Sequence, residues 1–348
     1  MKSLIVASTR EGAGKTSVLV GLAGAMGRCG YVKPLGDRFL YRKKRLWDYD
    51  AALFARLWGL GQEPETMSIG FDHSKLRFMY DRPGMFGELR RLLQAVGADR
   101  DVVLIECGKD LAFGSSVYLD PLTISQETGA PVVLVTGGGD DEMADDVAFV
   151  KRFVGADEAT IAGVIVNKAL HPEDVRDIHL PEIERLGIAV YGVIPHDPDL
   201  ATRTVALIAE RLFARVIAGE AGLTNTVRTV AVGAMSAAAA LGETMIHAAD
   251  KLIITSGDRS DMILTALDAG GTSAVVLTNN ILPPAHVISR AEEQHVPLLL
   301  VPGDTYAVAM QVEHIEPLLS ADDPRRLERV SSLVSENVDV GAIVSLAK

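Results

Sequence analysis

The sequence predicts an α/β protein, in which a mostly parallel sheet with helices on both faces is followed by a second, smaller α/β domain. Short apolar runs alternate with segments of helical spacing, and the apolar residues within each run are consecutive. Consecutive apolar residues are typical of strands buried on both faces, as in parallel sheets. The chain has 348 residues, of which 48% are hydrophobic, and this is enough for two cores.

The first predicted domain covers residues 1–219. Segments of helical spacing, such as residues 18–26 and 89–96, separate its predicted strands, and this order favours a parallel sheet. A helix is expected at Leu200–Ala218, before a turn-forming linker at residues 219–225. The predicted strands are Leu4–Ala7, Val102–Ile105, Val132–Val135, Ile161–Val166 and Ile188–Val193.

The second predicted domain covers residues 220–348, where apolar runs again alternate with segments of helical spacing. Its predicted strands are Thr229–Val232, Lys251–Thr255, Ala274–Leu277 and Pro297–Val301. Its predicted helices are Ala237–His247, Asp261–Ala269, Ala285–Gln294 and Thr305–Leu319, with a charged helix at Asp322–Val338.

Composition excludes several classes of partner. The formal net charge of −12 argues against a nucleic-acid binder, which needs a cationic face. The two cysteines make neither a disulfide framework nor a zinc site, and a reducing cytoplasm is the simplest setting. The N-terminal apolar run lacks the pattern of a signal peptide, and Val230–Ala249, interrupted by Glu243 and His247, falls short of a membrane span. We therefore expect a cytoplasmic protein without membrane partners.

The strongest local motif is the segment Thr9–Ser17, which lies between the first predicted strand and the first helix. Glycines in this context let backbone N–H groups surround phosphate oxygens at the positive end of a helix. Lys15 would reach the β and γ phosphates, and Thr16 would offer its hydroxyl to Mg²⁺. Thr9 stands where the motif has its first glycine, so an ordinary glycine-rich turn is the alternative.

The motif and five other segments resemble one family of nucleotide-binding proteins. This region is similar to the P-loop NTPase-type fold of dethiobiotin synthetase and the cobyrinic acid diamide synthases, and especially to the dethiobiotin synthetase-like N-terminal region of long phosphotransacetylases. The segments are Ser8–Ser17, Lys33-Pro34, Asp48–Asp50, Leu104–Gly108, Val164–Lys168 and Gly192–Pro195.

The resemblance implies that ATP and Mg²⁺ are the cofactors. Lys15 and Lys33 would be catalytic residues at the transferred phosphate, and Asn167 would contact the adenine edge. From the residues alone, Lys33 could equally be a surface lysine, and Asn167 a turn residue. The implied nucleotide-binding set is Thr9, Gly12, Ala13, Gly14, Lys15, Thr16, Ser17 and Asn167.

The implied metal site consists of Thr16, Asp50 and Glu106. Hard oxygen ligands suit Mg²⁺, and Glu106 stands at the carboxyl end of a predicted buried strand, where ligand sites of α/β folds lie. Asp50 could instead cap the helix that follows it.

Two positions depart from related families. Cys107 stands where a small residue is usual after the carboxylate. Arg10 stands at the signature lysine of related ATPases that dimerise around nucleotide, where it could contact phosphate across a dimer or remain a solvated charge.

Residues 228–335 resemble the DRTGG domain, whose motif stands here as Gly257–Asp261. Asp258, Arg259, Asp304 and Thr305 are the ligand candidates of this domain. The alternative is that the Asp258-Arg259 pair is architectural, with Asp258 capping the following helix. Asn279-Asn280 replaces glycines expected in a neighbouring loop.

Three functions remain open at this stage. The chain could be a regulatory module that binds ATP and Mg²⁺ and whose DRTGG domain senses a small molecule or engages an acyltransferase-type protein. It could be an ATP-dependent carboxylate-amine ligase, or a slow ATPase that switches a dimer. We do not expect glutamine hydrolysis, because no cysteine follows Cys107, or acetyl transfer by this chain alone. We favour the regulatory module and expect a homodimer.

Overall fold

The computed structural model describes residues 2–42, 44–153 and 161–347. The chain forms two compact units, the first made of Met1–Asp197 with Leu319–Lys348 and the second of Pro198–Leu318. This division differs from the predicted domains 1–219 and 220–348 in two ways: residues 198–219 belong to the second unit, and the C-terminal segment from Leu319 belongs to the first.

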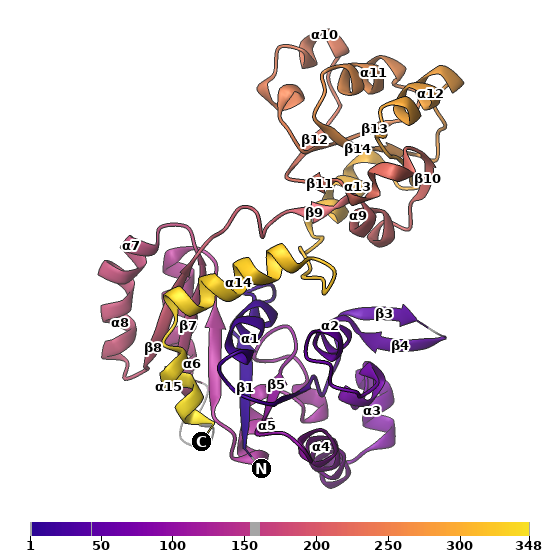
Figure 1. The fold of residues 1–348 in the computed structure, drawn as a ribbon. Helices are drawn as coiled ribbons and strands as arrows, with labels where there is room; N and C mark the ends of the chain where they lie inside the picture. The colour runs from indigo at the N-terminus through magenta and orange to yellow at the C-terminus, as the bar shows by residue number, and fades with distance from the viewer. Residues whose placement is uncertain (1, 43, 154–160, 348) are drawn as a thin grey trace. The chain divides into compact units, whose positions relative to one another are not determined.

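The first unit is built on a six-stranded parallel sheet with the order β2-β5-β1-β6-β7-β8 (Figure 1). This confirms the predicted fold class of this part of the chain. The strand β2, at Cys29–Val32, was not predicted, because four residues that include a glycine give little periodicity. The other strands are β1 (Ser3–Ser8), β5 (Val102–Glu106), β6 (Val132–Thr136), β7 (Ile161–Ala169) and β8 (Val190–Pro195).

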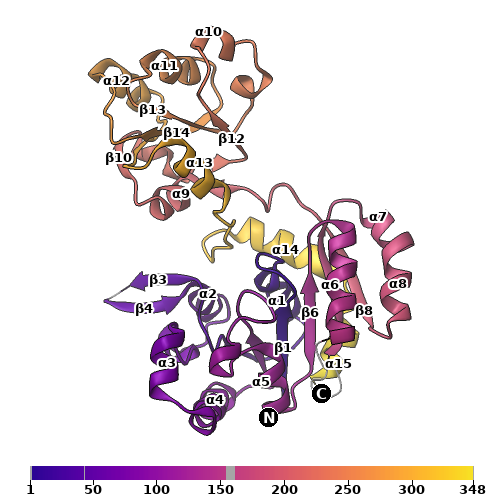
Figure 2. The same cartoon turned by 180° about the vertical axis from the view of Figure 1, so that it is seen from behind.

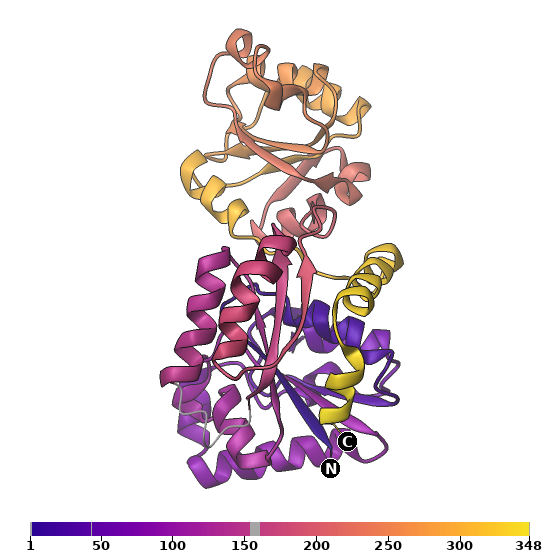
Figure 3. The ribbon, with the colours of Figure 1, turned by 90° about the vertical axis from the view of Figure 1, so that its left-hand side faces the viewer.

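Helices cover both faces of this sheet. One face packs on α4, α5, α6 and α8, and the other on α1, α14 and α15. Figure 3 shows the yellow C-terminal helices on one side of the sheet and magenta helices on the other. The helices are α1 (Lys15–Ala23), α2 (Tyr49–Leu57), η1 (Pro64–Met67), α3 (His73–Met79), α4 (Arg82–Gly97), η2 (Ser115–Val117), α5 (Pro121–Thr128), α6 (Asp140–Phe153), α7 (Pro172–Asp174), η3 (Val175–His179), α8 (Leu180–Arg185), α14 (Pro324–Asn337) and α15 (Val340–Leu346).

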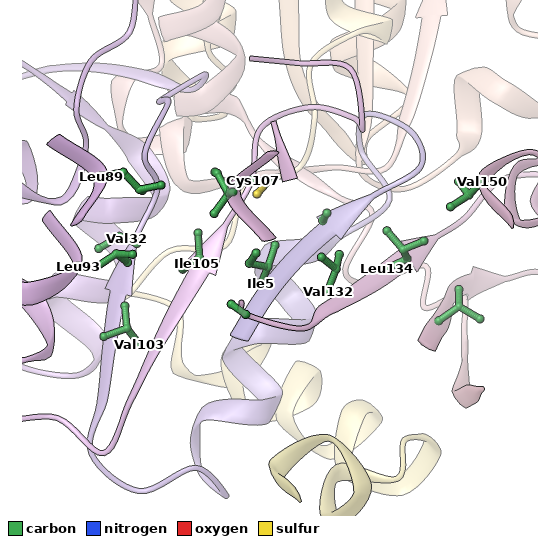
Figure 4. Packing of buried hydrophobic residues seen from close by; sticks show 14 of the residues in the cluster. Ile5, Val32, Leu89, Leu93, Val103, Ile105, Cys107, Val132, Leu134 and Val150 are labelled. Atoms are coloured by element: carbon green, nitrogen blue, oxygen red, sulfur yellow. The ribbon is translucent and has the colours of Figure 1, made fainter. Parts of the chain in front are cut away.

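Consecutive apolar residues fill the core on the α4 face of the sheet. In Figure 4, Leu89 and Leu93 of α4 lie beside Val32 and Val103 of two neighbouring strands. All four side chains are almost fully buried. The apolar runs of the sequence therefore predicted the centre of the sheet correctly, because burial on both faces requires them.

The C-terminal helix α14 lies against α1, as Figures 1 and 2 both show. A Cβ added to Gly21 of α1 would lie 2.3 Å from Cβ of Val334, so the two helix backbones approach closely at this glycine. After α14, Val338 forms a bridge with Gly192, and the Asp339 N–H donates to the Tyr191 carbonyl. These contacts explain why the last segment belongs to the first unit.

A β-hairpin precedes α2 and was not predicted. The hairpin consists of β3 (Phe39–Arg42) and β4 (Arg45–Asp48), which pair antiparallel within a segment rich in Arg and Lys. Asp48 then caps α2 by accepting from the N–H groups of Asp50 and Ala51. Asp50 therefore lies inside the first turn of the helix, and the capping role considered for it belongs to Asp48.

The second unit has a five-stranded mixed sheet with the order β10-β15-β14-β13-β12, in which only β10 runs antiparallel to its neighbour. This confirms the smaller second α/β fold. Its strands are β9 (Arg203–Thr204), β10 (Arg215–Ala218), β11 (Thr226–Val227), β12 (Thr229–Val232), β13 (Lys251–Ser256), β14 (Thr272–Thr278) and β15 (Leu298–Leu300). Its helices are α9 (Val205–Arg211), η4 (Glu220–Thr224), α10 (Ala237–Ala240), η5 (Thr244–His247), α11 (Ser260–Asp268), α12 (Ala285–Glu293) and α13 (Thr305–Glu313).

Three predicted helices differ from the structure. The helix expected at Thr305–Leu319 ends earlier, as α13 at Thr305–Glu313. The helix expected at Leu200–Ala218 is α9 followed by the edge strand β10, because Phe213 takes a left-handed φ of 50° that ends the helix. The helix expected at Ala237–His247 is two short helices, α10 and η5. Within the described residues, no helix combines the length and apolarity needed to cross a membrane.

Candidate functional site

The phosphate loop lies at the carboxyl edge of the first sheet, between the end of β1 and the start of α1. Gly12 and Gly14 have φ values of 75° and 95°, a region that favours glycine. A Cβ on Gly14 would also lie 2.2 Å from Nδ2 of Asn167. Two glycines of the motif are therefore required by backbone conformation, and one of them also by a close side chain.

Residues after β7 hold this loop in place. The Asn167 amide donates to the Ala13 carbonyl at 2.8 Å, and Lys168 Nζ donates to the Gly12 carbonyl at 2.6 Å. Asn167 is buried. In this structure Asn167 is thus a brace of the loop backbone, and its predicted contact with adenine stays a prediction.

Lys15 points into the site with its ammonium group bound to neutral oxygens. Its Nζ donates to Ser8 Oγ at 2.7 Å and to the Lys109 carbonyl at 3.4 Å. The side chain is buried, and burial lowers the pKa of Lys15, although the charge of Glu106 opposes this. Among the described residues, the ammonium group of Lys15 therefore has no carboxylate in direct contact.

Thr16 and Glu106 meet as the resemblance implies. Thr16 Oγ1 donates to Glu106 Oε1, and the Tyr31 hydroxyl donates to Glu106 Oε2, each at 2.9 Å. Burial, and then the charge of Asp50, raise the pKa of Glu106 to about 7. Burial likewise raises the pKa of Tyr31 well above its usual range. Glu106 is therefore a buried carboxyl group held by two hydroxyls, and its predicted role as a metal ligand stays a prediction.

Lys33 lies inside a cluster of carboxylates. Its Nζ is 2.6 Å from Asp50 Oδ2 and 3.6 Å from Asp48 Oδ2, and it also pairs with Asp37. Burial opposes the charge of Lys33, but the surrounding carboxylates outweigh it and raise its pKa well above the usual value. Only 1% of the Lys33 side chain is exposed. Lys33 is thus a buried structural cation in this structure.

The pKa values of Asp48 and Asp50 shift in opposite directions within this cluster. Burial raises the pKa of Asp48 to about 6, against the attraction of Lys33. Burial also opposes ionisation of Asp50, but Lys33 and Arg38 outweigh it and lower the pKa of Asp50. Asp50 is therefore the ionised partner of the two basic groups.

Arg38 links the two halves of the site. Its Nη1 lies 3.2 Å from Asp50 Oδ1 and 3.4 Å from Thr16 Oγ1. A small cavity opens beside it. The cavity is lined by Glu11, Gly12, Gly14, Lys15, Thr16, Lys33, Asp37, Arg38, Glu106 and Lys109.

Thr9, Arg10 and Ser17 are the remaining residues of the phosphate-loop segment. The Thr9 hydroxyl donates to Thr136 Oγ1 at 3.0 Å, and Ser17 is half-buried on α1. Arg10 pairs with Asp146 at 2.7 Å and with Glu142 at 3.3 Å, both on α6 of its own chain. Arg10 is therefore an exposed but paired charge.

Sequence reasoning missed Tyr31, Asp37, Arg38, Asp48 and Lys109. Most of their contacts join residues far apart in the sequence; the exceptions are the pairing of Lys33 with Asp37, four residues on, and the helix cap that Asp48 forms with Asp50 and Ala51. Residues 37–50, which include the hairpin, are rich in Arg and Lys, a composition that fits a pocket for an anionic substrate and a solvated loop equally well. That segment contains Asp37, Arg38 and Asp48, and only the fold shows which of its charges turn inward.

In the second unit, the four ligand candidates follow parallel strands at the carboxyl edge of the sheet. Arg259 pairs with Asp261 at 3.2 Å and donates to the Met235 carbonyl at 2.8 Å. Asp258 is exposed and does not cap α11, which begins after Arg259 without a side-chain cap, so the expected cap was wrong, whereas the bond of Arg259 to Met235 fits an architectural role. The Asp-Arg pair is thus Arg259 with Asp261.

Asp304 and Thr305 begin α13. Asp304 caps this helix by accepting from the Ala307 N–H at 3.0 Å. The Thr305 hydroxyl shares a hydrogen bond of 2.9 Å with Thr278 at the end of β14. Both residues have a structural role, and their roles toward a ligand stay predictions.

Comparison with known families agrees with this geometry. A family model described as an AAA domain (AAA_26) matches residues 2–204, which is more than half of the chain. The chain belongs to this family. A second model, the DRTGG domain, matches residues 207–315. The predicted order of a P-loop domain followed by a DRTGG domain is therefore confirmed.

Curated relatives cover nearly the whole chain. A phosphate acetyltransferase of Deinococcus radiodurans is 25% identical across 97% of this chain and 50% of its own length. One of Pseudomonas putida is 24% identical across 97% of this chain and 51% of its own length. The chain thus spans about half the length of these relatives, and the predicted resemblance to long phosphotransacetylases is confirmed.

Among solved structures, the CBS and DRTGG domains of the regulatory region of Clostridium perfringens pyrophosphatase, complexed with the activator diadenosine tetraphosphate, match at 17% identity. The match covers 33% of this chain and 47% of that one, with a TM-score of 0.29, which is too low to support an argument.

Proposed function

We propose that the first unit binds ATP with Mg²⁺ and that the chain is a regulatory module, with the DRTGG unit sensing a small ligand or engaging a protein partner. The contrast between the two buried lysines supports this best. Lys33 is neutralised by carboxylates, whereas Lys15 at the end of the phosphate loop donates to neutral acceptors, with no anion paired to it in the part of the chain that the structure describes. A buried cation without a paired anion is unfavourable alone and is stabilised by a phosphate.

The residues present also fit a magnesium ion. Thr16 and Glu106 bring two hard oxygens within 2.9 Å of each other, and Asp50 is ionised nearby. A bound Mg²⁺ would neutralise charge on the β- and γ-phosphate oxygens. The loop amides would bind the phosphates, and Asn167 would keep the loop backbone in its binding conformation.

A ligase remains the second candidate, because Lys15, Thr16 and Glu106 are all present. In a ligase Lys33 would act on the transferred phosphate or the acceptor. Here its Nζ is held between Asp37 and Asp50, with 1% of the side chain exposed. A lysine fixed in this way is poorly placed to contact a second substrate, which favours binding over group transfer.

The partners we propose follow from the relatives. Because similar chains occur in phosphate acetyltransferases, an acyltransferase-type protein is the partner we favour for the second unit, and a homodimer is the expected assembly. Arg10 gives little support to a nucleotide-driven dimer switch, because it already pairs with Asp146. Loss of nucleotide-dependent dimerisation in Arg10→Ala would restore that hypothesis.

A thermal-shift panel tests the proposal. ATP, ADP, GTP and a CoA ester are compared with and without Mg²⁺ on the wild type, on Lys15→Ala, and on Lys75→Ala as an exposed lysine control. We expect ATP to stabilise the wild type and the control but not Lys15→Ala. Equal shifts in all three proteins would contradict the site. Phosphate release that depends on an amine or carboxylate acceptor would favour the ligase.

A further inference from the structure

We propose that Arg38 occupies the metal position when nucleotide is absent, and that it thereby makes binding of a divalent cation conditional on binding of a phosphate ligand. This inference rests on the proposed function for the identity of the phosphate ligand. It concerns a residue to which neither the sequence nor the comparisons gave a role.

The contacts of Arg38 place a cation between two of the predicted metal ligands. Nη1 lies 3.2 and 3.4 Å from the two carboxylate oxygens of Asp50 and 3.4 Å from Thr16 Oγ1. The guanidinium keeps its positive charge at every ordinary pH. A divalent cation bound by Thr16 and Asp50 would therefore need the same oxygen atoms that Arg38 contacts. The positive charge of Arg38 would also repel it.

The backbone around Arg38 is fixed by the element that also positions Asp50. Asp48 Oδ2 accepts from the N–H groups of Asp37 and Arg38, while its Oδ1 accepts from the Asp50 N–H. One fully buried carboxylate thus sets the Arg38 backbone relative to the first turn of α2. The contact is built by the β3–β4 hairpin and is not an accidental surface approach.

Arg38 is nevertheless more exposed than the charged groups beside it. Its side chain is 26% exposed, whereas the side chains of Lys33 and Asp50 are each 1% exposed. Arg38 also lines the same cavity as Lys15. Phosphate oxygens bind guanidinium groups with strong, charge-assisted hydrogen bonds. A phosphate bound at Lys15 would offer Arg38 a partner to replace Thr16, and Arg38 would then release the metal position.

Manganese binding to the full chain without nucleotide tests this inference, because free Mn²⁺ can be counted by electron paramagnetic resonance. We expect Arg38→Gln to bind Mn²⁺ at least about tenfold more tightly than the wild type, since a positive charge in contact with two ligands is gone. When ATP is added, the wild type and Arg38→Gln should bind Mn²⁺ with similar affinity. Arg38→Gln combined with Asp50→Asn should lose the gain.

Lys109→Gln is the matched control, because it removes a positive charge from the same cavity. Lys109 pairs with Glu11 at 2.7 Å. Wild-type Mn²⁺ affinity equal to that of Arg38→Gln would overturn the inference, as would an equal gain in Lys109→Gln. Arg38→Lys, which keeps the charge but has a shorter reach, gives an intermediate affinity and replaces Arg38→Gln if that variant does not fold.

The inference and the proposed function fail in different ways. If ATP stabilises the chain but Arg38→Gln leaves Mn²⁺ binding unchanged, Arg38 does not hold the metal position and the proposed function stands. If ATP does not bind at all, the proposed function fails, while a gain of Mn²⁺ affinity in Arg38→Gln would still show that Arg38 occupies a cation site.

Discussion

Glu106 should make the first unit less stable as the pH rises toward neutral. Its carboxyl group is fully buried, and burial together with the charge of Asp50 raises its pKa from 4.5 to about 7. The folded state therefore binds the proton more tightly than the unfolded state does. This contribution to stability is complete below about pH 4.5 and is lost as the pH rises toward 7, since only the unfolded state has released the proton between these values.

The expected size of the effect follows from that window. Each pH unit between the two pKa values costs about 1.4 kcal/mol, so ionisation of Glu106 lowers the free energy of unfolding by about 3 kcal/mol. Glu106→Gln keeps the shape of the side chain but does not titrate. The free energy of unfolding of the variant, minus that of the wild type, should therefore be larger at pH 8 than at pH 4.5 by about this amount.

Urea unfolding followed by tryptophan fluorescence measures this difference. The chain has two tryptophans, and both Trp47 and Trp58 belong to the first unit, so the signal reports that unit. The control is Glu182→Gln, which removes an exposed carboxylate paired with Arg185. Identical pH dependence of Glu106→Gln and the wild type would refute the reasoning, because the other titrating groups are common to both proteins.

Three further changes test the site and its support. Gly21→Ala should lower the free energy of unfolding by about 1–3 kcal/mol in the same urea assay, because the added methyl would lie 2.3 Å from Val334 Cβ; an unchanged midpoint would show that α14 does not pack on α1. Lys33→Met should cost about 3–5 kcal/mol, because it leaves the buried Asp50 without its main partner; a neutral result would contradict the ionised cluster. Asn167→Ala should weaken ATP binding by about tenfold in calorimetry through loss of the bond to the Ala13 carbonyl, at about 1 kcal/mol or slightly more; unchanged affinity would remove Asn167 from the site.

Local sequence patterns predicted the parts of the molecule that depend on burial and backbone conformation. Consecutive apolar residues located five strands of the first sheet, and the phosphate-loop glycines occur where positive φ values require them. The helix expected at Leu200–Ala218 shows the limit of such patterns. The β-branched residues of β10 become a strand only through pairing with β15, which lies far along the chain.

The chemistry of the site was predictable where adjacent residues form a motif and not where distant charges meet. Lys15 and Thr16 belong to one motif, whereas Lys33 was expected near the transferred phosphate only through the resemblance, with a surface lysine as the alternative. The structure shows Lys33 among three carboxylates brought together by the hairpin and the start of α2. Arg38 was not predicted for the same reason, because its contacts join Thr16 on α1 to Asp50 on α2, which are far apart in the sequence.

Isothermal titration of ATP into the full chain, with Mg²⁺ present, tests the central claim most directly. The account predicts one ATP per chain for the wild type and for Lys75→Ala, and loss of measurable heat for Lys15→Ala. Absence of binding to the wild type, or equal binding by Lys15→Ala, would contradict the assignment of the β1–α1 loop as a nucleotide site.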